Sequence, residues 1–336
     1  MTTSRQATHA GSWYSSHGPT LNDELKGWLS AVTPEAGETN ASFEPPIKGC
    51  KAIIAPHAGY AYSGPTAAWA YKSIHTTNIK RVFILGPSHH VYLAECALSQ
   101  CQTYQTPIGD LPIDLETTKQ LEATGKFSPM SESTDEDEHS IEMHLPYVRK
   151  IFEGKDIKIV PILVGAINIK QEKSYGEILA PYLDAPDTFF VISSDFCHWG
   201  TRFSYTFYYP TPLPCSKHVK LSQSEKPTSH SIHASIRALD HEGMNALKLD
   251  RSADTEQKSA EDAHDAFAQY LARTKNTICG RHPIGVLMGA LAALEKGKAE
   301  KRVATLGWVR YAQSSACETI RDSSVSYASA YVVFQP

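Results

Sequence analysis

Three predicted strands of this 336-residue chain end directly before residues that could do chemistry. His57 follows the segment KAIIA, and His89 follows RVFIL. Asp195 and His198 follow TFFVI. Continuous β-branched or aromatic runs that stop at Gly, Pro or Ser are typical of buried strands. Because ligands of open α/β sheets bind beyond the carboxyl ends of the strands, we expect these side chains to share one site.

A cysteine before a predicted helix adds a candidate sulfur ligand. Cys279 and Gly280 precede Pro283, and proline fits the first turn of a helix. The dipole at a helix N-terminus favours thiolate, so we expect a lowered pKa for the Cys279 thiol. Imidazole and thiolate suit zinc, copper or iron better than calcium or magnesium. The residues thus predict a transition-metal site, with a small buried apolar cysteine as the alternative.

The acidic segment STDEDEHSIEMHLPY (133–147) has the composition, but not the spacing, of a metalloprotease helix. Its two histidines are five positions apart, about 140° around a helix, so they do not share a face. The acidic residues instead suit the first turn of a helix predicted over Ile141–Phe152. Candidates for hydrogen bonds to the ligands in this segment are Glu138, His139, Glu142 and His144.

Further residues are candidates for lining the same pocket. His90 adjoins one predicted ligand, and His282 lies three positions after another. The motifs HAGSWY and YAYSG place Trp13 and Tyr62 among aromatic neighbours. Aromatic side chains beside a cleft can form a rigid binding wall, although core packing would explain them equally well.

The elements that would position these residues alternate between strand and helix. The predicted buried strands are Lys51–Ala55, Arg81–Leu85, Ile157–Val164 and Thr188–Ser193, and the predicted antiparallel or edge strands are Val303–Tyr311 and Val325–Phe334. The predicted helices are Leu21–Val32, Thr66–Ile74, Ile141–Phe152, Gln171–Leu183, Ser231–Leu247, Asp262–Thr274 and Pro283–Lys296. This alternation predicts an α/β fold with a mostly parallel central sheet and helices on both faces.

The whole chain, residues 1–336, is expected to form one domain. Residues 33–46 and 210–229 lack periodicity and are rich in residues typical of exposed loops, so we expect surface insertions there. Lys and Arg number 32 and Asp and Glu 36, a net charge of −4, so no electrostatic argument favours nucleic acid or an anionic membrane as a partner.

Targeting signals and cysteine spacing indicate the compartment. The first sixteen residues contain no apolar signal-peptide core, and no run of about 18 apolar residues occurs. The seven cysteines are odd in number and include no CxxC pair, which favours neither a disulfide framework nor a zinc ribbon. We expect a cytoplasmic protein, with a nuclear location also open.

Long motifs in a fixed order carry a resemblance to a known family. They are HAGSWY, AIIAPHAGY, FILGPSHHV, TDEDEHSIEMHLPY, SSDFCHWG, NTICGRHPIGV, YAQSS and DSSVSYA. From about residue 8 to residue 331 the chain resembles the Memo family, named for mediator of ErbB2-driven cell motility. The resemblance implies a single α/β domain similar to class III extradiol dioxygenases, which are non-haem iron enzymes.

The resemblance also implies roles for individual residues. His57, His89 and Cys279 match the family's metal-binding trio, while Asp195 and His198 match residues of the same pocket and would do its acid–base work. The family is associated with copper or iron binding, redox activity and control of reactive oxygen species. It is also associated with cell-motility signalling and with phosphotyrosine peptides of receptor kinases, which Trp13 and Tyr62 would contact.

Three hypotheses for function follow. Ring-cleaving iron enzymes use two histidines and a carboxylate, but Cys279 stands at the third position, so ring cleavage is not expected. The first hypothesis is a redox-active copper or iron protein. The second is a peptide, phosphopeptide or protein-binding module on a dioxygenase-like fold. The third is a hydrolase in which zinc lowers the pKa of a water molecule.

Overall fold

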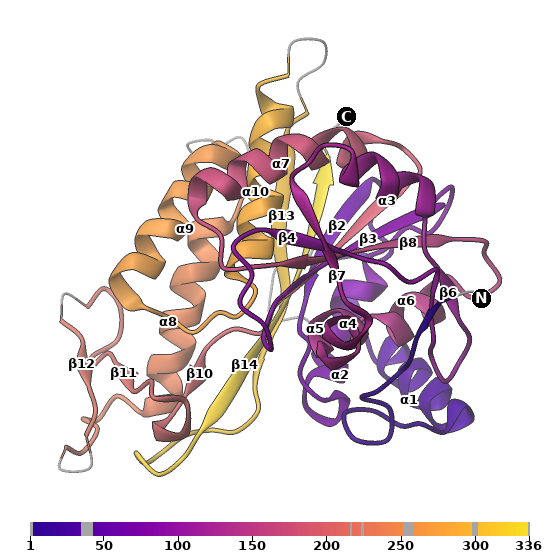
Figure 1. Cartoon of the computed structure of the whole chain (residues 1–336). Helices are drawn as coiled ribbons and strands as arrows, with labels where there is room; N and C mark the ends of the chain where they lie inside the picture. The colour runs from indigo at the N-terminus through magenta and orange to yellow at the C-terminus, as the bar shows by residue number, and fades with distance from the viewer. Residues whose placement is uncertain are drawn as a thin grey trace.

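The computed structural model describes residues 3–34, 43–215, 217–222, 225–250, 258–297 and 302–334. The strands of its largest sheet are β2 (Cys50–Ala55), β3 (Arg81–Pro87), β4 (Cys96–Ser99), β7 (Phe127–Met130), β8 (Lys158–Val164), β9 (Thr188–Ser193), β10 (His198–Trp199), β13 (Ala304–Gln313) and β14 (Ser324–Phe334). Their order is β10-β14-β2-β9-β3-β8-β4-β7, with β13 paired to β14 (Figure 1).

The centre of this sheet is parallel and its flanks are mixed. Strands β2, β9, β3 and β8 run parallel to one another. Strand β14 is antiparallel to both β2 and β13, and β4 is antiparallel to β8. The predicted α/β class and the antiparallel character of the last two strands are confirmed. The sheet as a whole is mixed, because β4 and β7 add a reversed pair at one edge. At four residues each, they are too short for a pattern in the sequence to reveal.

Helices cover both faces of the sheet (Figure 1). They are α1 (Gly18–Ser30), α2 (Tyr60–Lys72), α3 (Leu115–Glu122), α4 (Glu132–Asp137), α5 (His139–Glu142), α6 (Leu145–Ile151), α7 (Ile169–Asp184), α8 (Ile232–Leu247), α9 (Ala260–Thr274) and α10 (Arg281–Glu295). Alternate residues of a strand face opposite ways, so Phe83 belongs to the core on the side of α7 to α10, while Val82 belongs to the core on the side of α1, α2 and α6.

The helix predicted over Ile141–Phe152 is broken in two, which corrects the prediction. Helix α5 ends at Glu142 and α6 begins at Leu145, with Pro146 in its first turn. Proline has no amide hydrogen to donate to the carbonyl four residues earlier, but it fits the first turn of a helix, so one helix ends before Pro146 and a second begins around it. The break leaves His144 as the residue that caps α6.

The structure describes most of the second expected insertion, residues 210–229, but only part of the first, residues 33–46. Of residues 33–46, positions 35–42 lie outside the described residues, and Phe43 is buried against Trp69 and Tyr331. In residues 210–229, β12 (Val219–Lys220) pairs with β11 (Phe207–Tyr208), beside the short helix η2 (Thr201–Phe203). A small second sheet joins β1 (Ser4–Arg5), β5 (Thr103–Tyr104) and β6 (Leu111–Pro112). Within the described ranges, no helix is long and apolar enough to cross a membrane.

Helices α7 and α10 approach each other closely enough for backbone contact. A Cβ atom on Gly176 would lie 2.4 Å from the backbone nitrogen of Ala290 and 2.4 Å from the carbonyl carbon of Gly289. These distances are far inside van der Waals contact, so the helix pair requires glycine at position 176. The contact fixes α10, whose first turn follows Cys279.

Candidate metal centre

The sequence-predicted strand ends meet at one edge of the sheet. His57, His89 and Asp195 each lie two residues beyond the ends of the adjacent parallel strands β2, β3 and β9. The ligand atoms of His57, His89 and Cys279 all lie within 4.8 Å of one another. A second group with the same property among the described residues is His89, Glu138 and His139.

The hydrogen bonds of His57 determine its tautomer. The Ser193 hydroxyl donates its one proton to the carbonyl of Ser140 over 2.7 Å. It must therefore accept from Nδ1–H of His57, which lies 2.6 Å away. Nε2 of His57 then carries a lone pair, and it faces the sulfur of Cys279 at 3.1 Å. Burial and the neighbouring histidines hold the pKa of His57 well below its usual value, so the ring is neutral.

His89 is oriented in the same way by Glu138. Its Nδ1 lies 2.8 Å from one carboxylate oxygen of Glu138, and its amide donates to the other oxygen at 2.7 Å. Burial would raise the pKa of Glu138, but the hydrogen bonds and charge of His89 lower it to about 2. An ionised carboxylate only accepts, so Nδ1 carries a proton, and in the neutral ring Nε2 carries the lone pair. Both rings thus have the form in which histidines ligate metals, with Nδ1 held by an outer partner.

Cys279 reaches the site from the segment before α10. No side chain fits at Gly280, where a Cβ atom would lie 2.2 Å from the carbonyl oxygen of Ser193, so this segment packs directly on the end of β9. The sulfur accepts from the amide of Asp195 at 3.2 Å. Burial and the charge of Asp195 raise the pKa of the Cys279 thiol. The expected lowering of this pKa is wrong, because desolvation outweighs the helix dipole; a cation between sulfur and imidazole would replace the proton.

Asp195 holds the backbone of the site. It is buried, and its Oδ1 accepts from the amides of His57 at 2.8 Å and Ala58 at 3.3 Å. Burial raises the pKa of Asp195, against the opposing effect of His198. Its carboxylate therefore links the end of β9 to the residues after β2.

His198 is fixed with one nitrogen directed away from the backbone. Its Nδ1 donates to the carbonyls of Phe196 at 3.0 Å and Thr277 at 3.2 Å. Its amide donates to the hydroxyl of Thr277 at 2.7 Å, and that hydroxyl donates back to its carbonyl. Because Nδ1–H is engaged, Nε2 is the ring's proton acceptor.

A cavity of about 670 Å³, called the first cavity below, is lined by several of these groups. Besides His57, His89, Asp195 and His198, its lining includes His139, Trp13, Tyr62, Arg202, Phe203 and Tyr327. Trp13 is 36% exposed and Tyr62 is 64% exposed, so both aromatic rings are available at its mouth. Arg202 lies over the ring of Phe203.

His139 stands at the centre of a histidine cluster. Its ring stacks on that of His89 with centroids 4.4 Å apart, and lies 5.5 Å from that of His57 and 4.4 Å from that of Trp13. Burial and the neighbouring imidazoles lower the pKa of His139 to about 3, so the ring is neutral. His90 is exposed, with its ring 5.9 Å from that of His139.

Several sequence candidates lie outside the first cavity's lining, and three of them contact other parts of the protein. Glu142 is buried in an ion pair with Arg5. His144 is buried, and its Nδ1 lies 2.8 Å from the hydroxyl of Tyr71. His282 lines a separate cavity, where it contacts Glu172. His282 lies only three positions after Cys279, but the turn into α10 directs its side chain into the other cavity while Cys279 faces His57.

Several residues of the site had no signal in the sequence. Ser193 reads as the last residue of a strand, yet it sets the tautomer of His57. Residues 314–315 and 323–325, around the turn between β13 and β14, also line the first cavity. Only the paired motifs YAQSS and DSSVSYA could have indicated them, since both contain clustered serines.

Comparison with known proteins finds relatives from one family along nearly the whole chain. A family described as Memo-like protein matches residues 5–331. Protein MEMO1 of Danio rerio is 46% identical over 332 residues, covering 98% of this chain and 97% of the relative. Protein MEMO1 of Homo sapiens is 45% identical, covering 96% and 95%. Protein memo-1 homolog of Caenorhabditis elegans is 38% identical, covering 99% and 83%.

A solved structure of an uncharacterized protein from Escherichia coli K12 is 12% identical, with a TM-score of 0.46, and covers 84% of this chain and 99% of that one. That likeness is too weak to carry an argument. The sequence relatives and the family match are decisive by themselves. The chain belongs to the Memo family.

Proposed function

We propose that this protein is a redox-active metal-binding protein that holds copper or iron through His57, His89 and Cys279. The observation that carries the proposal is the convergence of these three ligand atoms within 4.8 Å. The outer hydrogen bonds to Ser193 and Glu138 support it, because they hold a proton on Nδ1 of each ring and so make Nε2 the nitrogen available to a metal.

The types of donor atom are consistent with copper or iron. Two imidazoles and a thiolate are soft enough for copper and also suit iron and zinc. A bound copper or iron ion would supply one-electron redox chemistry at the wall of the first cavity. The protein's own groups orient what enters: His198 can accept a proton at Nε2, and Asp195 keeps His57 in position through its amide. A role in controlling metal and reactive oxygen species follows from this proposal.

The double variant His57→Ala with Cys279→Ala tests the site. After anaerobic loading with copper(I) or iron(II) and gel filtration, we expect one ion per wild-type chain and none above background in the variant. The matched control, His75→Ala with Cys215→Ala, removes the same residue types outside the first cavity and should retain the ion. Metal content is measured by mass spectrometry and the redox change by electron paramagnetic resonance.

Two outcomes of this experiment would overturn the proposal. One is full metal retention by the His57→Ala/Cys279→Ala variant. The other is stoichiometric zinc without uptake of copper or iron, which would instead favour the hydrolase hypothesis.

A second candidate function is recognition of a peptide in the first cavity. The exposed rings of Trp13 and Tyr62 beside Arg202 favour it, since aromatic side chains and arginine dominate binding interfaces and arginine pairs with phosphate. A fluorescein-labelled phosphotyrosine peptide should lose about tenfold or more in affinity on Trp13→Ala, the usual scale of a binding hot spot. Unchanged fluorescence anisotropy titrations would remove this candidate.

We also propose a cytoplasmic location. No disulfide forms among the described residues, which include all seven cysteines. Free thiols, most of them buried, are typical of proteins in a reducing compartment.

A further inference from the structure

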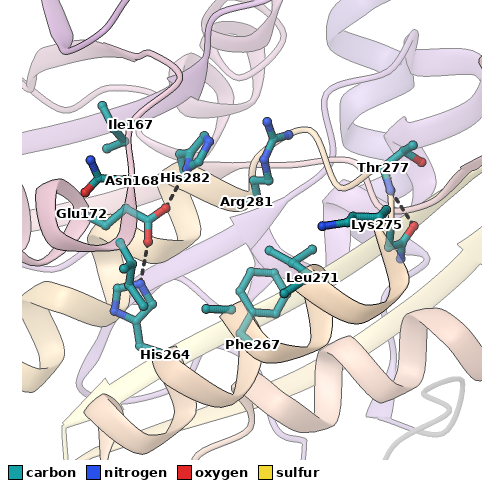
Figure 2. Close-up of a pocket in the computed structure, with 14 residues that line it drawn as sticks. Ile167, Asn168, Glu172, His264, Phe267, Leu271, Lys275, Thr277, Arg281 and His282 are labelled. Atoms are coloured by element: carbon teal, nitrogen blue, oxygen red, sulfur yellow. Dashed lines mark hydrogen bonds and ion pairs between the residues drawn. The ribbon is translucent and has the colours of Figure 1, made fainter.

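A second cavity of about 560 Å³ lies on the other side of the segment that carries Cys279. It shares no lining residue with the first cavity. Residues 275–282 form the wall between them: Cys279 faces His57 in the first, whereas Thr277, Arg281 and His282 line the second. Figure 2 shows this second cavity between α9, the start of α7 and residues 275–282.

One wall of the second cavity is an apolar stripe that ends in a cation. Phe267 and Leu271 are four residues apart on one face of α9, and Lys275, at the end of this helix, lines the cavity with them. Figure 2 shows them along the same side of the hollow. Lys275 caps α9 with a left-handed backbone, φ 54°, a position that glycine adopts with less strain. The helix therefore ends on a lysine, although glycine would adopt this backbone conformation with less strain.

The charges of the second cavity are unbalanced. Lys275 and Arg281 have no acidic partner among the described residues. The single carboxylate in the lining, Glu172, is engaged at both oxygens: 2.7 Å from Nε2 of His264 and 2.6 Å from Nδ1 of His282 (Figure 2). Burial would raise the pKa of Glu172, but these hydrogen bonds lower it, so the carboxylate stays ionised and occupied.

We propose that the second cavity binds a small organic anion, an apolar body that carries one phosphate or carboxylate group. The body would lie along Phe267 and Leu271, and the head group between Lys275 and Arg281. Glu172 would not repel it strongly, because two imidazoles already shield both carboxylate oxygens. This site is independent of the proposed metal centre, and its test needs no metal.

The test uses phenyl phosphate and benzoate as probes on the full chain with labelled histidine rings. Titration should saturably shift the ring signals of His264 and His282 and leave that of His139, in the first cavity, unchanged. Benzyl alcohol and inorganic phosphate each lack half of the ligand and should bind about tenfold more weakly or worse. If only one of the two anions binds, the head group is identified.

The variant Lys275→Gly with Arg281→Gln tests the cations. It should weaken binding of the aromatic anion about tenfold or more. Since glycine suits the left-handed position, its urea-unfolding midpoint should not fall below that of the wild type. The control Lys26→Gln with Lys80→Gln removes two exposed charges elsewhere and should bind normally.

Four results would each refute the site. They are no saturable binding of either anion, binding of benzyl alcohol as tight as that of the anions, undiminished affinity in the Lys275→Gly/Arg281→Gln variant, and signal shifts at His139 in place of His264.

Discussion

Replacing Gly176 by alanine is expected to lower the free energy of unfolding by about 3 kcal/mol, at the upper end of what overpacking costs. The added Cβ would lie 2.4 Å from backbone atoms of Ala290 and Gly289, and backbone cannot rotate away as a side chain can. Helices α7 and α10 would have to separate. Alanine favours a helix interior over glycine by about 1 kcal/mol, which is too little to offset the clash.

The matched control is Gly27→Ala in α1, where a new Cβ would meet nothing within 4 Å. Only the helix-propensity effect acts there, so we expect a gain of up to about 1 kcal/mol. Urea unfolding of the three proteins measures both effects. If Gly176→Ala stabilised the protein as Gly27→Ala does, the backbone contact between α7 and α10 would be disproved.

The second large effect is expected for Glu142→Gln. The Glu142 carboxylate is buried and accepts from Arg5 at 2.8 Å, from the hydroxyl of Tyr14 at 2.7 Å and from the amide of His9 at 2.9 Å. Glutamine would leave the buried Arg5 without part of its counter-charge. Breaking such a pair costs about 3–5 kcal/mol, and we expect a loss of about 3 kcal/mol at pH 7.

The loss should depend on pH in a defined direction. Burial would raise the pKa of Glu142, but His9 and Arg5 lower it from 4.5 to about 2. A lowered pKa stabilises the folded state above the unfolded value and loses that effect as the pH falls toward the folded value. The gap between wild type and Glu142→Gln should therefore shrink between pH 4.5 and 2, to roughly half at pH 3.

Urea denaturation of both proteins at pH 7 and pH 3 measures this gap. Glu153→Gln is the control: that carboxylate is on the surface, paired with Lys150, and should change stability little at either pH. A gap for Glu142→Gln that stayed constant from pH 7 to pH 3 would argue against an ionised Glu142 in the folded protein.

Much of the site was accessible from sequence because its signals are local. Apolar runs that end before His57, His89 and Asp195 mark the carboxyl ends of strands, and parallel strands bring those ends together. The helix over Ile141–Phe152 shows the limit. The apolar pattern continues through Pro146, but the missing amide breaks the helix and leaves His144 buried.

The sequence by itself determined the types of candidate ligand, the strand ends that present them and the α/β class, since these follow from patterns only a few residues long. Only the tertiary structure decided which nitrogen of each imidazole is held by a hydrogen bond, because the deciding partners, Ser193 and Glu138, are 136 and 49 residues from their histidines. It also decided that one short segment directs Cys279 toward His57 of the first cavity and His282 into the second cavity. The pKa of the Cys279 thiol is also raised, although its place before a helix predicts a lowered pKa. The reason is burial, which is a property of the whole fold.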